Sequence, residues 1–251
     1  MAEGALLFGV SFALWSFVRA GRRPWLAGLA VALAFCAKQS ALALLPVGLL
    51  AVLWVDPPQT VRRRLAGAAL YLGVFLVVAL ALNPLYWRSP LGAARAALAA
   101  RQDLMQRQAA DALRLAPDKV LDTPAKRAIG LLAHLYFTPP SFAELSNYLE
   151  ATAPAEASYL ASDLHTLGRG FIAGGIFFAL SLFGLVWILV NLRRVDPSKR
   201  LRQVLFLLAA GVQTAAVLAL LFLPWQRYVM PVLPFACLLA ACGAAGPLDR
   251  S

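Results

Sequence analysis

The chain has 251 residues, of which 61% are hydrophobic and only 14% charged, with a formal net charge of +11. Soluble domains have about 45 to 50% apolar and about 25% charged residues, so this composition excludes an ordinary soluble domain and predicts a membrane protein. The positive charge does not favour nucleic-acid binding, because the basic residues form short clusters between apolar runs.

The first apolar segment, residues 4–18, follows Glu3 and lacks the basic start and the cleavage site of a signal peptide. The longest run, PWLAGLAVALAFCAKQSALALLPVGLLAVLWV at residues 24–55, has Lys38 as its only charge. One helix needs about 20 residues to span the hydrocarbon, so we predict two short helices with Lys38 and Gln39 at the turn. A lysine inside a bilayer is costly, and a retained one usually faces a cavity, a partner or water.

Four further apolar segments bring the predicted bundle to about seven spans, two of them short. They are residues 65–83, 171–192, 204–223 and 229–245. The predicted domains are the membrane helices of residues 1–83 with the Lys38 hairpin, the external (periplasmic) loop domain of residues 84–170, and the C-terminal membrane helices of residues 171–251. The sequence therefore predicts an all-α, polytopic transmembrane helical bundle with a helical external loop domain.

Three clusters of basic residues give the predicted orientation. They are Arg19, Arg22 and Arg23; Arg62, Arg63 and Arg64; and Arg193, Arg194, Lys199, Arg200 and Arg202. The positive-inside rule places all three on the cytoplasmic side. The first two flank residues 24–55, so the chain must cross the membrane an even number of times between them. This supports the hairpin and places Lys38 at the outer face.

In the external region, residues 91–115 have a helical pattern that places one narrow stripe of small and apolar side chains on a single face. The stripe consists of Leu91, Leu98, Met105 and Ala112, with arginines beside and opposite it. One interpretation is an interfacial helix that lies on the membrane surface. The other is a helix packed against the rest of the loop.

Several kinds of catalytic site have no signature in this sequence. It contains no Gly-rich phosphate loop after a strand, no G-x-S-x-G nucleophile motif and no histidines with metal-ligand spacing. His134 and His165 stand alone, and the three cysteines lie in apolar runs. We therefore expect no cofactor, and the sequence does not indicate a divalent metal.

The predicted topology gathers a set of polar residues at the outer membrane face. They are Glu3, Lys38, Gln39, Asn83, Arg88, His165, Arg169, Arg227 and Tyr228. A lysine and an arginine that converge there suit an anionic lipid head group, because a phosphate accepts charge-assisted hydrogen bonds from both.

Four segments resemble, in the same order, the GT-C glycosyltransferases related to protein O-mannosyltransferases and to the aminoarabinose lipid A transferases (glycosyltransferase family 39). They are AEGALLFGVSFALW (residues 2–15), AGLAVALAFCAKQSALALLPVGLL (27–50), NPLYWRSPLGA (83–93) and PWQRYVMPVLPFACLLAA (224–241). The resemblance implies transfer of a sugar from a polyprenyl-phosphate carrier to an extracytoplasmic protein, lipid or glycan. It also implies a multi-pass protein of the bacterial plasma (inner) membrane that takes part in cell envelope glycosylation.

The resemblance implies roles for individual residues. Lys38 matches the lysine that holds the donor phosphate, and we expect Gln39 beside it to bind substrate as well. Glu3 matches an acid near the reaction centre and is the catalytic candidate. Arg227 and Tyr228 match a C-terminal pair, which we assign to the lipid phosphate or to helix positioning.

The chain departs from the family pattern at two points. The threonine that usually precedes the lysine is Ala37 here, which removes one hydroxyl contact. The family's acidic base lies in the first external loop, whereas this chain matches the family only from several spans later. It therefore resembles a C-terminal portion of such an enzyme. We expect it to be inactive alone, because loss of a general base costs about 10² to 10⁴ in rate.

Each site residue also has a purely structural interpretation. Lys38 can snorkel to the interface, Arg227 can anchor a helix beside Trp225, and Glu3 can be a solvated terminus. The competing functional class is a membrane transporter or a non-catalytic membrane subunit, in which Lys38 would line a substrate path. Transporters usually show inverted repeats, and no second copy of the Lys38 segment occurs, so the enzyme is favoured.

Overall fold

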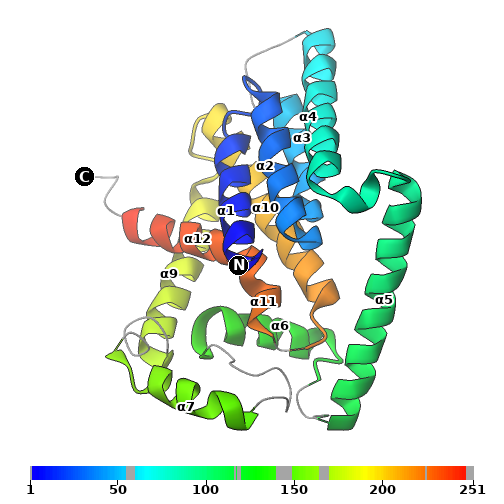
Figure 1. Cartoon of the computed structure of the whole chain (residues 1–251). Coiled ribbons are helices and arrows are strands. Elements are labelled where there is room, and N and C mark those ends of the chain that lie inside the picture. Colours follow the sequence, from blue (N-terminus) through cyan, green and yellow to red (C-terminus); the bar gives the residue numbers. More distant parts are fainter. Residues whose placement is uncertain are drawn as a thin grey trace. The chain divides into compact units, whose positions relative to one another are not determined.

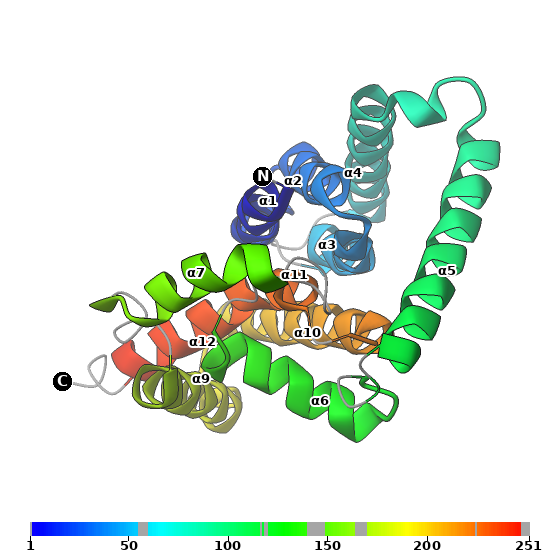
Figure 2. The same cartoon turned by 60° about the horizontal axis from the view of Figure 1, so that its bottom comes forward.

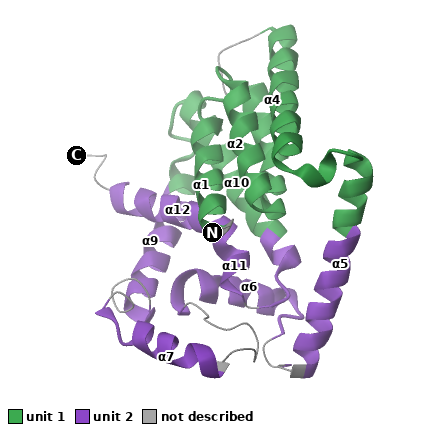
Figure 3. Cartoon of the chain, viewed as in Figure 1, with its two compact units in different colours: residues 1–98, 188–216 green, residues 99–187, 217–251 purple. Residues whose placement is uncertain are grey.

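The computed structural model describes residues 2–54, 60–115, 117, 120–139, 149–163, 170–223 and 225–246. Every regular element in these residues is a helix, which confirms the predicted all-α class (Figure 1). The chain divides into two compact units (Figure 3). Unit 1 contains residues 1–98 and 188–216, and unit 2 contains residues 99–187 and 217–251. The three-part division predicted from the sequence concerns position relative to a membrane and stays a prediction.

The helices are distributed over the two units as follows. Unit 1 includes α1 (Ala2–Phe17), α2 (Pro24–Ala37), the 3₁₀ helix η1 (Gln39–Ala43), α3 (Leu44–Trp54), α4 (Val61–Leu82) and the 3₁₀ turn η2 (Pro84–Tyr86). Unit 2 includes α6 (Pro124–Leu132), the π-helical turn η4 (Ala133–Phe137), α7 (Leu149–Leu160), α11 (Gln226–Val229), the 3₁₀ turn η5 (Met230–Val232) and α12 (Leu233–Ala245). Helices that contribute residues to both units are α5 (Pro90–Leu115), α9 (Gly170–Asn191) and α10 (Pro197–Leu220).

Four helical segments among the described residues are long and apolar enough to cross a membrane. They are Val61–Leu82, Gly170–Asn191, Pro197–Leu220 and Gln226–Ala245. Three other apolar segments, Glu3–Phe17, Pro24–Ala37 and Gln39–Trp54, are shorter. The 14 residues of α2 cover only about 21 Å, against about 30 Å of hydrocarbon. Membrane helices are therefore supported, whereas the predicted number of seven spans is not confirmed.

Within unit 1, α2 and α4 pack side by side and run in the same direction. Gly28 in α2 lies so close to α4 that a Cβ there would meet the Tyr71 carbonyl oxygen. At the C-terminal ends of both helices, the Asn83 Nδ2 donates a hydrogen bond to the Cys36 Sγ at 3.2 Å. Later residues of α2 thus meet later residues of α4. A parallel pair requires an intervening segment that returns the chain to its starting side.

That returning segment is α3, which runs antiparallel to α4. The Tyr71 hydroxyl donates to the Leu45 carbonyl oxygen at 2.8 Å, and Val52 lies beside Gly67. Because α2 is parallel and α3 antiparallel to the same helix, the chain reverses between them at Lys38. This reversal agrees with the predicted pair of short helices, whereas their crossing of a membrane stays a prediction. Figure 2 shows α1, α2, α3 and α4 as one group, seen from one end.

The basic clusters lie away from Lys38 within unit 1. Residues 19–23 precede α2 and residues 62–64 begin α4, so both clusters lie at the end opposite to Lys38 and Asn83. The third cluster lies just before α10 and in its first turns. Helix α10 meets η1 further along, where the Gln213 Nε2 donates to the Ser40 carbonyl oxygen. Arg202 precedes Gln213 by about 16 Å of helix. The basic clusters thus lie at one end of unit 1 and Lys38 at the other, and the positive-inside rule depends on such an asymmetry of charge.

The predicted orientation can be tested with single cysteines at two exposed serines. In a background with Cys36→Ser, Cys237→Ala and Cys242→Ala, we expect Ser89→Cys to react with a membrane-impermeant maleimide from outside. Ser198→Cys should react only after the membrane is permeabilised. Ser89 follows η2 at the Lys38 end of unit 1, whereas Ser198 begins α10 beside the third basic cluster. The opposite labelling pattern would invert the topology.

The core of unit 2 forms where η4 meets α9 and the C-terminal helices. The Tyr136 ring lies against Phe177 and Phe178, with ring centroids 5.1 and 5.2 Å away. Helices α9 and α12 approach so closely that a Cβ at Gly184 would meet the Leu239 carbonyl oxygen. Such close contact through small residues is usual between membrane helices, where backbone proximity replaces the hydrophobic driving force.

Arg127 ties α6 to the last turn of α10 within unit 2. Its guanidinium donates to the carbonyl oxygens of Ala219 at 3.2 Å and Leu218 at 3.4 Å, and its Nε donates to the Leu121 carbonyl oxygen at 3.0 Å. The Leu218 and Ala219 carbonyls belong to the end of α10, where no intrahelical donor remains. Arg127 thus caps α10 and fixes the chain that leads to α11.

The stripe predicted on α5 has two different environments. In the second half, Ala112 is fully buried and Met105 lines a pocket of unit 2, so this half packs against the protein. In the first half, Leu91 is 77% and Leu98 62% exposed. The second half thus packs mainly against Leu223 and its neighbours, outside the predicted loop domain, and contact of the first half with a membrane surface stays a prediction.

Candidate functional site

Lys38 occupies the break between α2 and η1. Its backbone is extended, with φ −160° and ψ 129°, whereas the residues on either side are helical. Its N–H donates to the Ala34 carbonyl oxygen and its own carbonyl oxygen accepts from the Ala41 N–H, both at 3.0 Å. The backbone of this half-buried lysine is therefore held from both sides at the end of the helical hairpin.

Glu3 lies at the same end of unit 1 as Lys38. Helices α1 and α2 are antiparallel neighbours, with Gly9 packed directly against Ala34. From this contact, Glu3 lies about 9 Å further along α1 and Lys38 about 6 Å further along α2, in the same direction. Gln39 follows Lys38 and is exposed. Unit 1 thus brings together three of the residues predicted from the sequence.

Gln213 is a residue of this region that sequence reasoning missed. It is fully buried, and its Nε2 donates to the Ser40 carbonyl oxygen at 3.2 Å. The Gln213 Oε1 and the Ser40 Oγ are both buried, and neither has a hydrogen-bond partner in the described part of the chain. A buried polar group without a partner costs about 1 to 3 kcal/mol, so this pair indicates a place for a polar ligand group or for water.

A signal for Gln213 was present in the sequence. The residue interrupts the apolar run of residues 204–221. A polar side chain inside a membrane-length helix is a functional-site hypothesis by default. Asn83, by contrast, has a structural role, because its Nδ2 bonds the Ala79 carbonyl oxygen at 2.7 Å and the Cys36 Sγ at 3.2 Å. It ends α4 and fastens that end to α2.

Arg227 and Tyr228 lie in α11, within unit 2. The Trp225 and Tyr228 rings are stacked, with centroids 5.5 Å apart. The Arg227 guanidinium lies 4.5 Å from the Trp225 ring centroid and 5.5 Å from that of Tyr228. Arg101, in α5, lies 5.9 Å from the Tyr228 ring centroid. Tyr228 is therefore flanked by two guanidinium groups, and this arrangement favours an anion beside the phenol.

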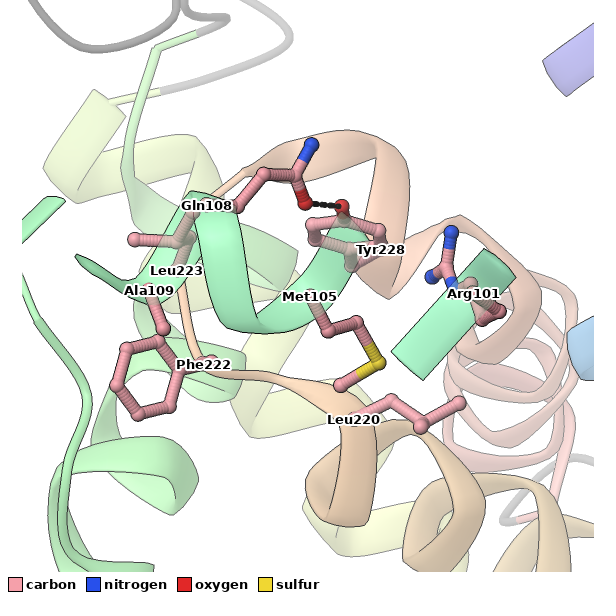
Figure 4. Close-up of a pocket in the computed structure, with 8 residues that line it drawn as sticks. All are labelled: Arg101, Met105, Gln108, Ala109, Leu220, Phe222, Leu223 and Tyr228. Carbon is pink, nitrogen blue, oxygen red and sulfur yellow. Dashed lines mark hydrogen bonds between the residues drawn. The ribbon is translucent and has the colours of Figure 1, made fainter. Parts of the chain in front are cut away.

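A small pocket adjoins Tyr228 in unit 2 (Figure 4). Its lining comes from α5 and from the chain between α10 and α11: Arg101, Met105, Gln108, Ala109, Leu220, Phe222, Leu223 and Tyr228. The Tyr228 hydroxyl donates a long hydrogen bond, 3.5 Å, to the Gln108 Oε1. The side chains thus combine an apolar floor with polar groups at one side.

The residues predicted at the outer face fall into separate groups. Glu3, Lys38 and Gln39 belong to unit 1, whereas Arg227 and Tyr228 belong to unit 2. His165 and Arg169 lie outside the described residues. Among the residues that the structure does describe, no three histidine, cysteine or carboxylate side chains could together hold a metal ion.

Comparison of the chain with protein-family models, with curated protein sequences and with solved structures finds no match in any of the three. A functional assignment therefore depends on the motifs and on the geometry of the two units.

Proposed function

We propose that the chain belongs to a membrane glycosyltransferase that moves a sugar from a polyprenyl-phosphate carrier to an acceptor outside the cytoplasm. The observation that carries this proposal is the polar end of unit 1. There the Lys38 ammonium and Glu3 lie at one end of the α1 and α2 pair, away from the first two arginine clusters. The buried Gln213 and Ser40 pair adjoins the same turn.

Lys38 holds the donor phosphate in this proposal. An ammonium group at the end of a hairpin can reach the head group of a lipid whose chain lies in the bilayer, and a charge-assisted hydrogen bond to phosphate is among the stronger polar contacts. The Gln213 Oε1 and the Ser40 Oγ adjoin this turn, but both are closed off from solvent, so a buried water and not the sugar would satisfy them.

The chemistry is displacement at the anomeric carbon. The acceptor oxygen forms a bond to that carbon while the bond to the phosphate oxygen breaks, and the electron pair leaves with the lipid phosphate. The acceptor proton passes to a carboxylate. Lys38 stabilises the charge that develops on the leaving phosphate, and Glu3 lies near the reaction centre. Arg227 and Tyr228, which belong to unit 2, position α11 in this proposal.

Binding of a lipid phosphate by the full chain in nanodiscs tests the proposal. A polyprenyl phosphate should bind at least about tenfold more tightly than the polyprenol of the same length, because a charge-assisted contact is lost with the phosphate. A sugar-loaded polyprenyl phosphate should compete for the same site. Equal binding of the phosphate and the alcohol would contradict the proposal. Uptake of a water-soluble solute into liposomes without any lipid binding would favour a transporter instead.

A further inference from the structure

The pocket beside Tyr228 has the two-sided chemistry of a lipid site. Met105, Leu220 and Phe222 give it an apolar floor, and Arg101 lies beside Tyr228, on the side away from Gln108 (Figure 4). The enclosed space is about 10 Å³, enough for about one water molecule, and the rest of the depression opens to solvent. A lipid phosphate and the first methylenes of its chain would therefore lie across the open side of this depression and not inside a cavity.

The position of the pocket in unit 2 also fits a lipid. Leu220 is the last residue of one membrane-length helix, Pro197–Leu220, and Tyr228 lies in the first turn of another, Gln226–Ala245. The ends of membrane-length helices are expected at the boundary between hydrocarbon and head groups, where aromatic and basic side chains concentrate. A lipid phosphate lies at this depth.

The charges of α5 leave Arg101 oriented toward the pocket. Arg107 forms an ion pair with Asp103 at 2.9 Å, and Arg114 lies 4.0 Å from Asp111. Both aspartates thus face arginines of their own helix. The Arg101 guanidinium instead lies 5.9 Å from the centroid of the Tyr228 ring, which also stacks with Trp225. The pocket mouth is therefore positively charged.

We propose that this pocket binds an anionic glycerophospholipid of the surrounding membrane. The Arg101 guanidinium donates to the phosphate, the Tyr228 hydroxyl donates to a head-group oxygen, and the first part of an acyl chain lies on Met105, Leu220 and Phe222. The site goes beyond the proposed transferase function, because it uses a membrane lipid as a resident ligand and requires no sugar donor.

The test measures the thermal stability of the full chain in a neutral detergent as phosphatidylglycerol is added. Phosphatidylglycerol should raise the melting temperature at lower concentrations than phosphatidylcholine does. Arg101→Gln should raise the half-saturating concentration about fivefold, since one arginine near anionic lipid contributes about 1 kcal/mol. Arg95→Gln is the matched control, because Arg95 is an exposed arginine of the same helix that does not line the pocket. It should leave that concentration unchanged.

A second variant keeps the test decisive if Arg101→Gln folds poorly. Met105→Phe fills the apolar floor without changing any charge and should weaken the phosphatidylglycerol response. As a direct probe, Trp225 in a variant with the other five tryptophans replaced by phenylalanine should be quenched more strongly by brominated phosphatidylglycerol than by brominated phosphatidylcholine.

Several results would overturn the assignment. Equal effects of Arg101→Gln and Arg95→Gln would show that the lipid does not bind through the charge of Arg101. Equal responses to both lipids would show an apolar surface without head-group selectivity. Stabilisation by inorganic phosphate alone would show a simple anion site. Displacement of phosphatidylglycerol by polyprenyl phosphate at much lower concentrations would assign the pocket to the sugar donor. Lys38→Met separates the proposals, because it should leave the phosphatidylglycerol response intact.

Discussion

Replacing Lys38 by methionine is expected to raise the dissociation constant of a polyprenyl-phosphate analogue about tenfold to a hundredfold, because a lost charge-assisted hydrogen bond is worth about 1.5 to 3 kcal/mol. Methionine keeps most of the length of the side chain and removes the ammonium group, with its charge and its hydrogen-bond donors. The measurement is equilibrium binding of the analogue to purified full-length chain in nanodiscs. If Lys38 only reaches toward the interface, binding will be unchanged within error.

The fold should tolerate this substitution. The turn at Lys38 depends on backbone hydrogen bonds to Ala34 and from Ala41, which methionine retains. Removal of a charge from an apolar segment also lowers the cost of membrane insertion, which for lysine is about 2.5 to 3.5 kcal/mol at a helix centre. We therefore expect the melting temperature of Lys38→Met to equal or exceed that of the unmodified chain.

Lys199→Met is the matched control for Lys38→Met. Lys199 is an exposed lysine of the third basic cluster, 4.0 Å from Asp196, near the start of α10. Lys199→Met changes the net charge by the same amount as Lys38→Met. Lys199 lies far along α10 from the contact between Gln213 and Ser40. It should leave lipid-phosphate affinity unchanged. An equal loss of affinity in both variants would indicate a general electrostatic effect and would contradict a specific site at Lys38.

The hairpin was predictable because it depends on local quantities. A run of 32 residues is too long for one span, and its single charge marks the place where a helix embedded in apolar surroundings is most easily interrupted. The basic clusters on either side of the run predict an even number of membrane crossings between them. The structure adds the reason for its stability, since the Tyr71 hydroxyl bonds the Leu45 carbonyl oxygen across α4 and α3.

The number of membrane-length helices was less predictable. Apolar composition extends across residues 2–54 with few interruptions, yet the helices end at Phe17, Ala37 and Trp54 and remain short. The composition of a segment predicts whether it can lie in the hydrocarbon core of a membrane. Helix length depends on where turns form and on which faces pack together, and this information is carried by contacts between helices.

Contacts over long sequence separations were also inaccessible to sequence reasoning. Gln213 and Ser40 are 173 positions apart, and Tyr228 and Gln108 are 120 apart. No local periodicity couples such pairs. Tyr228 was identified through a motif, whereas its neighbour Arg101 was visible only as one of several arginines on a helix. The contact of Tyr228 with Gln108 forms only when α5 and α11 pack together in unit 2.

The packing of α2 on α4 leads to a second prediction with a large effect. A Cβ added at Gly28 would collide with the Tyr71 carbonyl oxygen, a backbone atom that cannot move without shifting α4. Gly28→Ala should therefore destabilise the chain by about 1 to 3 kcal/mol, as overpacking does in tight interiors. The measurement is the free energy of unfolding, or the melting temperature, in a fixed detergent.

Gly73→Ala is the matched control, because nothing lies within 4 Å of a Cβ at Gly73, in the same helix as Tyr71. It makes the same chemical change and should stabilise the chain by up to about 1 kcal/mol through helix propensity alone. The two alanine substitutions should thus shift stability in opposite directions. Because the contact at Gly28 holds α2 parallel to α4, and α2 ends at Lys38, Gly28→Ala should also weaken lipid-phosphate binding. If both variants are stabilised equally, α2 does not pack on α4 at Gly28, and the hairpin that presents Lys38 would have to be arranged differently.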